Sequence, residues 1–340
     1  MTLLTIEEIE SACAGRAAAE PDPHPVDAPA LTLQAKFFPL GFPVELRTNS
    51  EEVLALSRTQ WGYFEQRFDT EPMLAEVYVV ENTQQDCTVQ QECPPQPQYR
   101  FLEPLLTTIA DPQHYSIADL SRSRTKIVAT SAALRHPLYF RYFFLECGAG
   151  VHIATRHTTP VHAGCVTLNG RGILLCGDSG AGKSSLSFAC ARAGWGYVSD
   201  DACFLLHGRR VIGNCHQVRL RPTAGDLFPE IAGLPLTPRA EGKPSIELLT
   251  GSLPHVRRQH CADVNAIVFL NRRVQGTSGL FPYSRDVARR YMRQQLFGSR
   301  ASLARQYDEV ERLLEADVLE LRYQTLDQAV EHLRMLAEGR

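Results

Sequence analysis

The chain has 340 residues, of which 44% are hydrophobic and 21% charged, and its formal net charge is −3. This length exceeds the size at which one hydrophobic core usually keeps growing, so we expect more than one domain. The small negative charge gives no overall field to attract nucleic acid, and no apolar stretch is long enough to cross a membrane, so we expect neither partner. The first ten residues carry three glutamates and no basic cluster, which favours the cytoplasm over secretion.

Ten cysteines are scattered along the chain, and no pair has the C-x-x-C or paired-histidine spacing of a zinc motif. Cys165, Cys176 and Cys190 lie within apolar stretches and are typical of small core residues. Cys87 and Cys93 are the closest two cysteines, and a disulfide or metal pair between them stays open, although the absence of an export signal favours two separate thiols.

The first 150 residues are expected to form a helix with a linker (1–30) and an accessory α/β domain (31–150). Thr5-Ile6-Glu7-Glu8 matches a capping box at the start of a helix that runs to about Ala19, and the four prolines of 20–30 indicate an extended linker. Alternating apolar residues predict strands over 31–38, 44–48, 75–81, 115–118 and 125–129, helical periodicity predicts helices over 51–68 and 137–148, and 82–98 has the composition of a loop. This region carries no catalytic motif.

Residues 151–340 are expected to form a second α/β domain. Asn169-Gly170 is a strong tight-turn signal between the apolar segments 161–168 and 173–176, so these segments predict a hairpin. Further strands are expected over 197–199, 203–206, 211–212, 217–220, 264–270 and 318–323, and helices over 184–193, 284–314 and 326–337.

The stretch Gly177-Asp178-Ser179-Gly180-Ala181-Gly182-Lys183-Ser184 matches the Walker A pattern G-x-x-x-x-G-K-[ST] without a mismatch. An expected strand precedes it and an expected helix follows it, which is the context the motif requires. Backbone N–H groups and the helix N-terminus then hold phosphate oxygens, Lys183 places a charge on the outer phosphates, and Ser184 can ligate magnesium. The motif predicts a nucleotide site, with ATP or GTP both open because base contacts leave no pattern.

Asp200-Asp201 follows the next expected strand. Phosphoryl transfer needs carboxylates, because magnesium must be held and a hydroxyl nucleophile must lose its proton. Strands that run in the same direction end at the same edge of a sheet, so we expect this pair beside the phosphate loop.

The segment from His162 to Ser184, together with Val198-Ser199-Asp200-Asp201, resembles the catalytic domain of the HPr serine kinase/phosphorylase family. The resemblance implies an HPr-kinase-like P-loop fold with a mixed sheet, use of ATP and Mg²⁺, phosphorylation of a serine hydroxyl on a protein, and a homo-oligomer. It implies that His162 lies in the active site, that Asp200 is the proton acceptor and that Asp201 is a magnesium partner.

The chain also departs from that family. The family has a glutamate after the Lys-Ser of the loop, where this chain has Ser185, and 230–246 lacks the family's signature for phosphorolysis. We therefore expect no efficient phosphorylase activity. The first 150 residues do not resemble the family's usual N-terminal domain, so HPr is not the expected acceptor, and a hydroxyl on a protein, a peptide or a small molecule remains open.

Several basic residues downstream of the loop are candidates for phosphate or substrate contacts. Arg219 and Arg221 alternate on one expected strand, Lys243 follows Gly242 in an expected loop, and the pair Arg272-Arg273 ends an expected buried strand. Arginine and lysine in such places either bind phosphate or are simply solvated. We select Arg221 and Lys243 as the phosphate contacts.

Three other functions fit parts of the pattern. A nucleotide-binding regulatory or scaffold protein would keep the loop without phosphoryl transfer. An ATPase that remodels a partner would use a hydrolysis-directing glutamate where this chain has Asp200-Asp201, and phosphoenolpyruvate carboxykinase chemistry shares only the general loop plan. The sequence therefore favours an ATP-dependent, Mg²⁺-assisted kinase of a hydroxyl.

Overall fold

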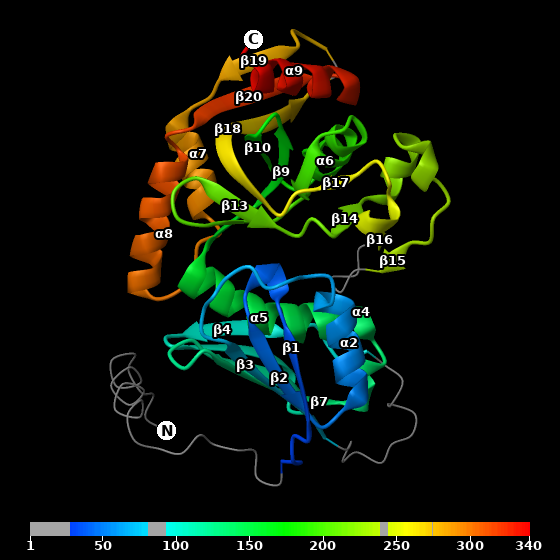
Figure 1. Cartoon of the computed structure of the whole chain (residues 1–340), viewed down its shortest axis with the longest axis vertical. Helices are drawn as coiled ribbons and strands as arrows, with labels where there is room; N and C mark the ends of the chain where they lie inside the picture. Colours follow the sequence, from blue (N-terminus) through cyan, green and yellow to red (C-terminus); the bar gives the residue numbers. More distant parts are fainter. Residues whose placement is uncertain (1–27, 81–92, 239–243, 274) are drawn as a thin grey trace, which may run out of the picture.

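The computed structural model describes residues 28–80, 93–238, 244–273 and 275–340 (Figure 1). The predicted N-terminal helix, most of the proline-rich linker, Cys87 and Lys243 lie outside the described residues. The described chain forms two mixed α/β halves, a seven-stranded sheet with its helices and a ten-stranded sheet with its helices.

The first half contains a strand–helix–strand unit, a β-meander and a long helical segment. Its strands and helices are β1 Leu33–Phe37, β2 Val44–Thr48, α2 Glu51–Trp61, β3 Met73–Val80, β4 Gln98–Leu102, β5 Leu105–Asp111, β6 His114–Asp119, β7 Arg124–Thr130, α3 Ser131–Leu134, α4 Pro137–Phe140, α5 Cys147–His152 and the π-helical stretches η3 Arg141–Glu146 and η4 Ile153–His157. A 3₁₀ turn, η1 Pro39–Gly41, separates the first two strands.

The seven-stranded sheet has the order β1-β2-β3-β7-β6-β5-β4. β3 lies parallel to both β2 and β7, and the other neighbours are antiparallel. Aromatic residues of the helical segment, such as Phe140 and Phe144, are fully buried in one core with Val44, Val77 and Ile127 of the strands. The helices therefore cover one face of this sheet, and α5 lies between the sheet and the second half (Figure 1).

The second half is larger and carries the phosphate-loop motif. Its strands and helices are β8 Thr159–Val161, β9 Ala163–Leu168, β10 Arg171–Cys176, α6 Lys183–Arg192, β11 Gly196–Ser199, β12 Cys203–Leu205, β13 Arg210–Gly213, β14 Gln217–Leu220, β15 Thr237–Pro238, β16 Pro244–Leu249, β17 Arg257–Arg258, β18 Cys261–Arg272, β19 Gly279–Pro282, α7 Arg285–Arg293, α8 Arg300–Leu313, β20 Asp317–Tyr323 and α9 Leu326–Glu338, with 3₁₀ turns at η5 Pro222–Asp226, η6 Pro229–Ile231 and η7 Thr250–Ser252.

The central strand β10 pairs antiparallel with β9 and parallel with β18, and β18 pairs parallel with β20. β11 pairs antiparallel with β9, so it runs in the same direction as β10 with β9 between them. The C-terminal ends of β10 and β11 consequently lie at the same edge of the sheet. β14, β15 and β16 form a separate three-stranded sheet.

Alternate side chains of β10 enter two different cores. Ile173 and Leu175 pack with Leu186 and Cys190 of α6 and with residues of α9, whereas Leu174 and Cys176 pack with residues of α7 and α8, among them Met292. Successive side chains of a strand point to opposite faces of the sheet, and helices cover both faces here. The strand therefore needs apolar residues at every position from 173 to 176.

Several of the described elements depart from the expected ones, and the helix expected over 137–148 continues as a helical segment to His157. Helix α2 ends at Trp61, not at 68, and the segment 284–314 holds two helices, α7 and α8, with Gly298 at a φ of 135° in the turn between them. β4 and β5, whose hairpin begins inside the predicted loop 82–98, were not expected, nor were β16 and β19. β4 is exposed along its whole length, so it lacks the alternating apolar pattern that identifies a strand.

Helix α8 connects the two halves through its side chains. Gln306 is fully buried and donates from Nε2 to the carbonyl of Ala154 at 3.1 Å. Arg305 donates from Nη2 to the carbonyls of Thr155 and Thr158, each at 3.0 Å. These carbonyls belong to the last turn of the helical segment 137–157 and to the residue after it. Carbonyls at the end of a helix have no later N–H group of that helix to bond, so side chains of α8 supply the donors.

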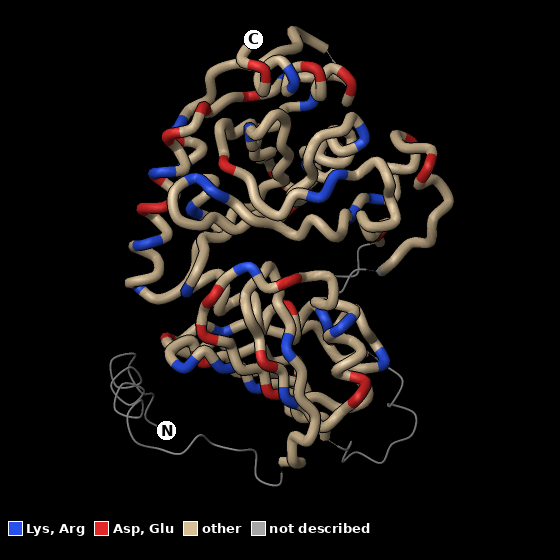
Figure 2. The backbone as a smooth tube through the Cα atoms, viewed as in Figure 1, with Lys and Arg blue, Asp and Glu red and all other residues tan. Residues whose placement is uncertain are grey.

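Acidic and basic residues are interspersed over both halves (Figure 2). No helix within the described ranges is both long enough and apolar enough to span a membrane. The expectations of a cytoplasmic location and of no nucleic-acid partner stay predictions.

Candidate active site

The Walker A stretch forms a loop between β10 and α6, as its sequence predicts. Gly177, Gly180 and Gly182 have φ values of 149°, 94° and 99°, a range that side chains disfavour. A Cβ atom on Gly180 would lie 3.2 Å from Nη1 of Arg221, and one on Gly182 would lie 3.1 Å from the hydroxyl of Tyr323. The glycines are therefore required both for the turn and for the close approach of neighbouring side chains.

The other loop residues lie around this turn. Asp178 and Ser179 are both exposed, and the carbonyl of Asp178 accepts from the N–H of Ala181 at 3.0 Å. Ser184 and Ser185 lie in the first turn of α6. The unpaired N–H groups of a helix N-terminus attract anions, so the loop and α6 present a surface suited to phosphate.

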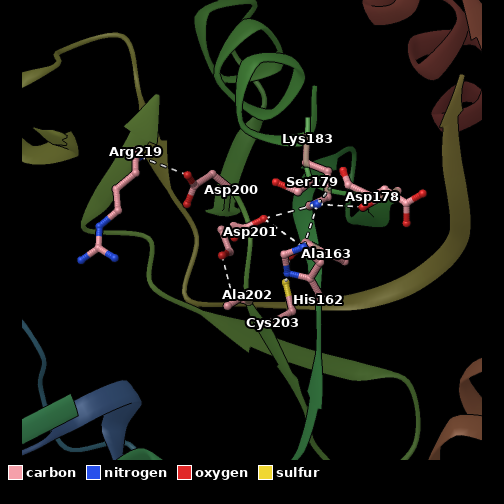
Figure 3. A network of polar contacts seen from close by, with 12 residues as sticks. His162, Ala163, Asp178, Ser179, Lys183, Asp200, Asp201, Ala202, Cys203 and Arg219 are labelled. Carbon is pink, nitrogen blue, oxygen red and sulfur yellow. Dashed lines mark hydrogen bonds and ion pairs between the residues drawn. The ribbon is translucent and has the colours of Figure 1, made fainter. Parts of the chain in front are cut away.

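Lys183 is the centre of the polar network (Figure 3). Its side chain is only 4% exposed, and its ammonium group donates to the carbonyl of Gly177 at 2.8 Å. The same Nζ lies 2.9 Å from Nε2 of His162 and 3.4 Å from Oδ1 of Asp201. A buried ammonium needs such partners, because desolvation of an unpaired charge is costly.

His162 lies between the loop and the aspartate pair. Its Nε2 is 3.6 Å from Oδ1 of Asp201. Burial lowers the pKa of His162, and the charge of Lys183 lowers it further, while Asp201 opposes the shift. The imidazole is therefore neutral at pH 7 and accepts the hydrogen bond that the ammonium of Lys183 donates.

Asp200 and Asp201 occupy different environments, although they are adjacent in sequence. Asp200 turns toward β14, where its Oδ2 accepts from the N–H of Arg219 at 3.0 Å, whereas Asp201 turns toward Lys183 and is half-exposed (Figure 3). Burial raises the pKa of Asp200, and the neighbouring Asp201 carboxylate raises it as well. One carboxyl is thus shifted toward the range of a general base, and the other faces the phosphate loop.

A glycine in the preceding strand brings the aspartates close to α6. A Cβ atom on Gly164 of β9 would lie 2.5 Å from Oγ of Ser187 and 3.0 Å from the carbonyl oxygen of Asp200. Real Cβ atoms do not approach backbone oxygen that closely without displacement, so the strand, the helix and the aspartate turn can meet only because residue 164 has no side chain.

Of the basic candidates, Arg221 lies at the loop. It follows β14, and its Nη2 donates to Oγ of Ser179 at 3.2 Å. Arg219, one position from the same strand end, forms an ion pair with Glu247 at 3.2 Å. The structure therefore brings Arg221 to the exposed tip of the phosphate loop, while the position of Lys243 is not described.

Two tyrosines at the loop had no signal in the sequence. The hydroxyl of Tyr291, on α7, lies 2.8 Å from the carbonyl of Gly177, 2.9 Å from that of His162 and 3.2 Å from the N–H of Gly177. The hydroxyl of Tyr323, at the end of β20, donates to the carbonyl of Ala181 at 3.3 Å. Both fasten the loop from elements more than 100 residues away in sequence, as the contact separations of 114 and 142 residues show, and no local pattern identifies them.

The donor set fits a magnesium nucleotide. Mg²⁺ prefers oxygen ligands, and the hydroxyl of Ser184 and the half-exposed carboxylate of Asp201 are groups of this kind. The glycine loop, the N-terminus of α6 and Lys183 provide the positive groups for phosphate oxygens. Two surface cavities of about 430 Å³ lie elsewhere, one beside the Asn169-Gly170 turn and one beside Arg305, so neither is the nucleotide site.

No family model matches the chain, and none of the curated proteins matches it. Among solved structures, the HPr(Ser) kinase/phosphatase from Coxiella burnetii is similar over 54% of this chain and 99% of its own length, with 14% sequence identity and a TM-score of 0.29. This likeness is distant.

Proposed function

We propose that the protein is an ATP-dependent kinase that transfers phosphate to a serine or other hydroxyl of a protein, a peptide or a small molecule. The observation that carries the proposal is the cluster of Lys183, His162 and Asp201 at the end of β10, with contacts of 2.9 to 3.6 Å. This cluster lies beside a glycine loop that has the backbone geometry for phosphate.

Each residue has a distinct task in the proposal. The loop N–H groups and Lys183 bind and orient the phosphates, and Arg221 approaches them from β14. Asp200 accepts the proton of the acceptor hydroxyl, a task to which its raised pKa is suited. Ser184 and Asp201 would hold Mg²⁺, which supplies charge neutralisation for the transferred phosphoryl group.

The neutral His162 has a positioning task. It accepts a hydrogen bond from Lys183 at 2.9 Å and contacts Asp201 at 3.6 Å, so it fixes the direction of the ammonium group between loop and carboxylate. The carbonyl of Gly177 accepts a further hydrogen bond from that ammonium. The cation is therefore already held at the loop, and little reorganisation is needed when phosphate arrives.

The proposal is tested with labelled ATP, or labelled GTP in a parallel series, and Mg²⁺ in the presence of a lysate of the producing cells. We expect label transfer by the wild type and a loss of at least ~100-fold in Lys183→Ala, because a preorganised charge at the phosphates is removed. Lys36→Ala, at an exposed position of β1, is the matched control and should transfer label like the wild type.

Equal labelling with wild type and Lys183→Ala would exclude the kinase activity. Tight nucleotide binding by the wild type with no labelled product in any lysate fraction would favour the alternative, a nucleotide-binding regulatory or scaffold protein without turnover. Equilibrium dialysis with labelled nucleotide distinguishes that outcome from a site that binds no nucleotide.

A further inference from the structure

Cys215, His216 and His260 come together at a place outside the candidate active site. Cys215 and His216 lie in the turn between β13 and β14, and His260 directly precedes β18. One ligand atom from each side chain lies within 4.8 Å of the other two. Cys215 and His216 are buried and His260 is half-buried.

The separations suit a tetrahedral zinc ion. With Zn–S near 2.3 Å and Zn–N near 2.0 to 2.1 Å, neighbouring ligand atoms in a tetrahedron are about 3.3 to 3.6 Å apart. Sγ of Cys215 lies 3.3 Å from Nδ1 of His260. No two of the three ligand atoms are more than 4.8 Å apart. A side-chain rotation that moves a ligand atom by about 1 Å brings such a pair into the tetrahedral range.

His216 offers an unused ligand atom. Its side chain is 7% exposed, and its Nε2 is buried without a hydrogen-bond partner among the described residues. A thiol–imidazole hydrogen bond between Cys215 and His260 would account for that pair by itself, but it gives Nε2 of His216 no partner. Buried polar atoms without a protein partner are rare, and a bound ion is one of the groups that can satisfy them.

The backbone of the turn is held firmly. The carbonyl of Cys215 accepts from Oγ1 of Thr250 at 2.6 Å, and the carbonyl of His216 accepts from the N–H of Thr250 at 2.9 Å. The ring of His216 also contacts Phe64 edge-on at 5.0 Å and Tyr63 at 6.0 Å. The backbone that carries Cys215 and His216 is therefore fixed before any ion binds, which reduces the cost of binding.

The charges around the cluster are compatible with a thiolate ligand. Arg258 and Arg67 are positive groups whose charge acts on the Cys215 thiol, and a bound zinc ion deprotonates a coordinating thiol.

Arg258 must move when an ion binds to Nε2 of His216. Its Nη1 lies 3.5 Å from Nδ1 of His216, and a ligating neutral imidazole carries its proton on that nitrogen. The contact is at the outer limit of a hydrogen bond, and Arg258 is exposed, so the guanidinium can turn into solvent. The carboxylate of Glu65, whose charge acts on His260, is itself exposed.

We propose that Cys215, His216 and His260 form a zinc site with three protein ligands and solvent at the fourth position. An ion here would join the turn that begins β14, the start of β18 and, through the packed rings, the Tyr63-Phe64 segment of the first half. β14 also holds Asp200 through Arg219 and leads into Arg221. The zinc site would therefore stabilise the strand on which part of the candidate active site depends.

The experiment uses the full-length protein after removal of metal with a chelator. We expect one zinc ion per chain by elemental analysis after reloading, and with Co²⁺ in its place a thiolate-to-cobalt charge-transfer band. Cys215→Ser and His260→Gln should lose stoichiometric binding and that band. The exposed Cys93→Ser and His255→Gln are the matched controls and should keep both.

A second readout is the melting temperature, which zinc should raise in the wild type and in the two controls but not in the two ligand variants. Circular dichroism verifies that each variant is folded, and His260→Gln, at a half-buried position, serves if Cys215→Ser does not fold. Zinc below stoichiometry in folded wild type would overturn the proposal, as would equal binding by Cys215→Ser or His260→Gln. These measurements do not depend on kinase activity.

Discussion

Asp200 and Asp201 show how two adjacent residues of the same type acquire different chemistry. Their side chains leave the end of β11 in different directions, one toward the N–H of Arg219 and one toward Lys183. The first carboxyl loses water contacts, so its pKa rises, while the second keeps half of its surface exposed. A proton acceptor and a metal ligand can in this way be supplied by a single dipeptide.

Asp200→Asn tests the proton-acceptor role. We expect phosphoryl transfer to fall by roughly 10²- to 10⁴-fold, because an amide cannot take the proton of the hydroxyl, while nucleotide affinity stays within a few-fold. The wild-type rate should decrease as the pH falls through the raised pKa of Asp200, since only the ionised carboxylate accepts a proton. Steady-state label transfer and nucleotide titration measure the two quantities.

The control for this variant is Asp69→Asn, in the first half and away from the phosphate loop in sequence, which should keep the wild-type rate and pH profile. Wild-type transfer by Asp200→Asn would exclude Asp200 as the base. Loss of nucleotide binding in Asp200→Asn would show instead that the residue acts through the structure of the loop.

The four-residue strand β14 lies between several functional loops of the second half. Its first residue follows the Cys215-His216 turn, its Arg219 binds Asp200 and pairs with Glu247, and Arg221 at its end reaches the phosphate loop. β14 pairs with β16 in the small three-stranded sheet and not with the central sheet. Movement of this small sheet would therefore change the surroundings of Asp200 and of the phosphate loop together.

Arg221→Ala tests the contribution of this element to nucleotide binding. Removal of a charge-assisted contact to phosphate should weaken the affinity by about 10-fold, or about 1.4 kcal/mol. Calorimetric titration with a non-hydrolysable ATP analogue measures the change. Arg221→Lys should recover part of it, and Arg100→Ala, on the exposed strand β4, should leave the affinity unchanged. An unaltered affinity in Arg221→Ala would remove Arg221 from the site.

Much of the second half could be predicted, because its strands are buried on both faces and its loop carries a motif. The apolar run Ile173–Cys176, the Asn169-Gly170 turn and the Walker A glycines each have a local physical cause. The expectation that strands running in the same direction end at the same edge placed Asp200-Asp201 beside the phosphate loop. It did not predict that the antiparallel strand β9 lies between β10 and β11.

The features that could not be predicted depend on contacts between distant segments. Tyr291 and Tyr323 approach the loop only after α7 and β20 have packed, and the exposed strand β4 is held by pairing with β5 and not by an apolar face of its own. Cys215, His216 and His260 were overlooked for the same reason, since 44 residues separate the second and third of them, the difference between 260 and 216. Zinc-motif spacings apply to local loops and do not describe such a cluster.

At the scale of the whole molecule, the two halves are joined by the helical segment 137–157, in which His152 is fully buried. Its Nε2 lies 2.9 Å from Oγ1 of Thr125 in β7. Burial lowers the pKa of His152 from 6.5 to about 4, and the charge of Arg156 lowers it further. Between these two values the unfolded chain binds a proton that the folded chain does not, so the free energy of unfolding falls as the pH decreases.

For His152 alone this loss amounts to about 2 kcal/mol between about pH 7.5 and pH 5. His152→Gln should remove that part of the pH dependence, and His255→Gln, at an exposed site, should not. Urea unfolding at the two pH values measures the difference. Glu146 and Asp200, whose pKa values are raised, change the free energy of unfolding with pH in the opposite direction. Their contribution is the same in the wild type and in both histidine variants, so it does not affect the comparison. Parallel curves for wild type and His152→Gln would contradict the prediction.

The parallel pairing of β10 with β18 has a consequence for synthesis of the protein. The strand that enters the phosphate loop obtains its parallel neighbour only from Val264 onward, and Tyr323 reaches Ala181 later still. Lys183 therefore leaves the ribosome well before the segments that enclose it, whereas the seven described strands of the first half pair with one another. The nascent chain can complete its first sheet early, but nucleotide can help the second half to fold only after translation has passed β20.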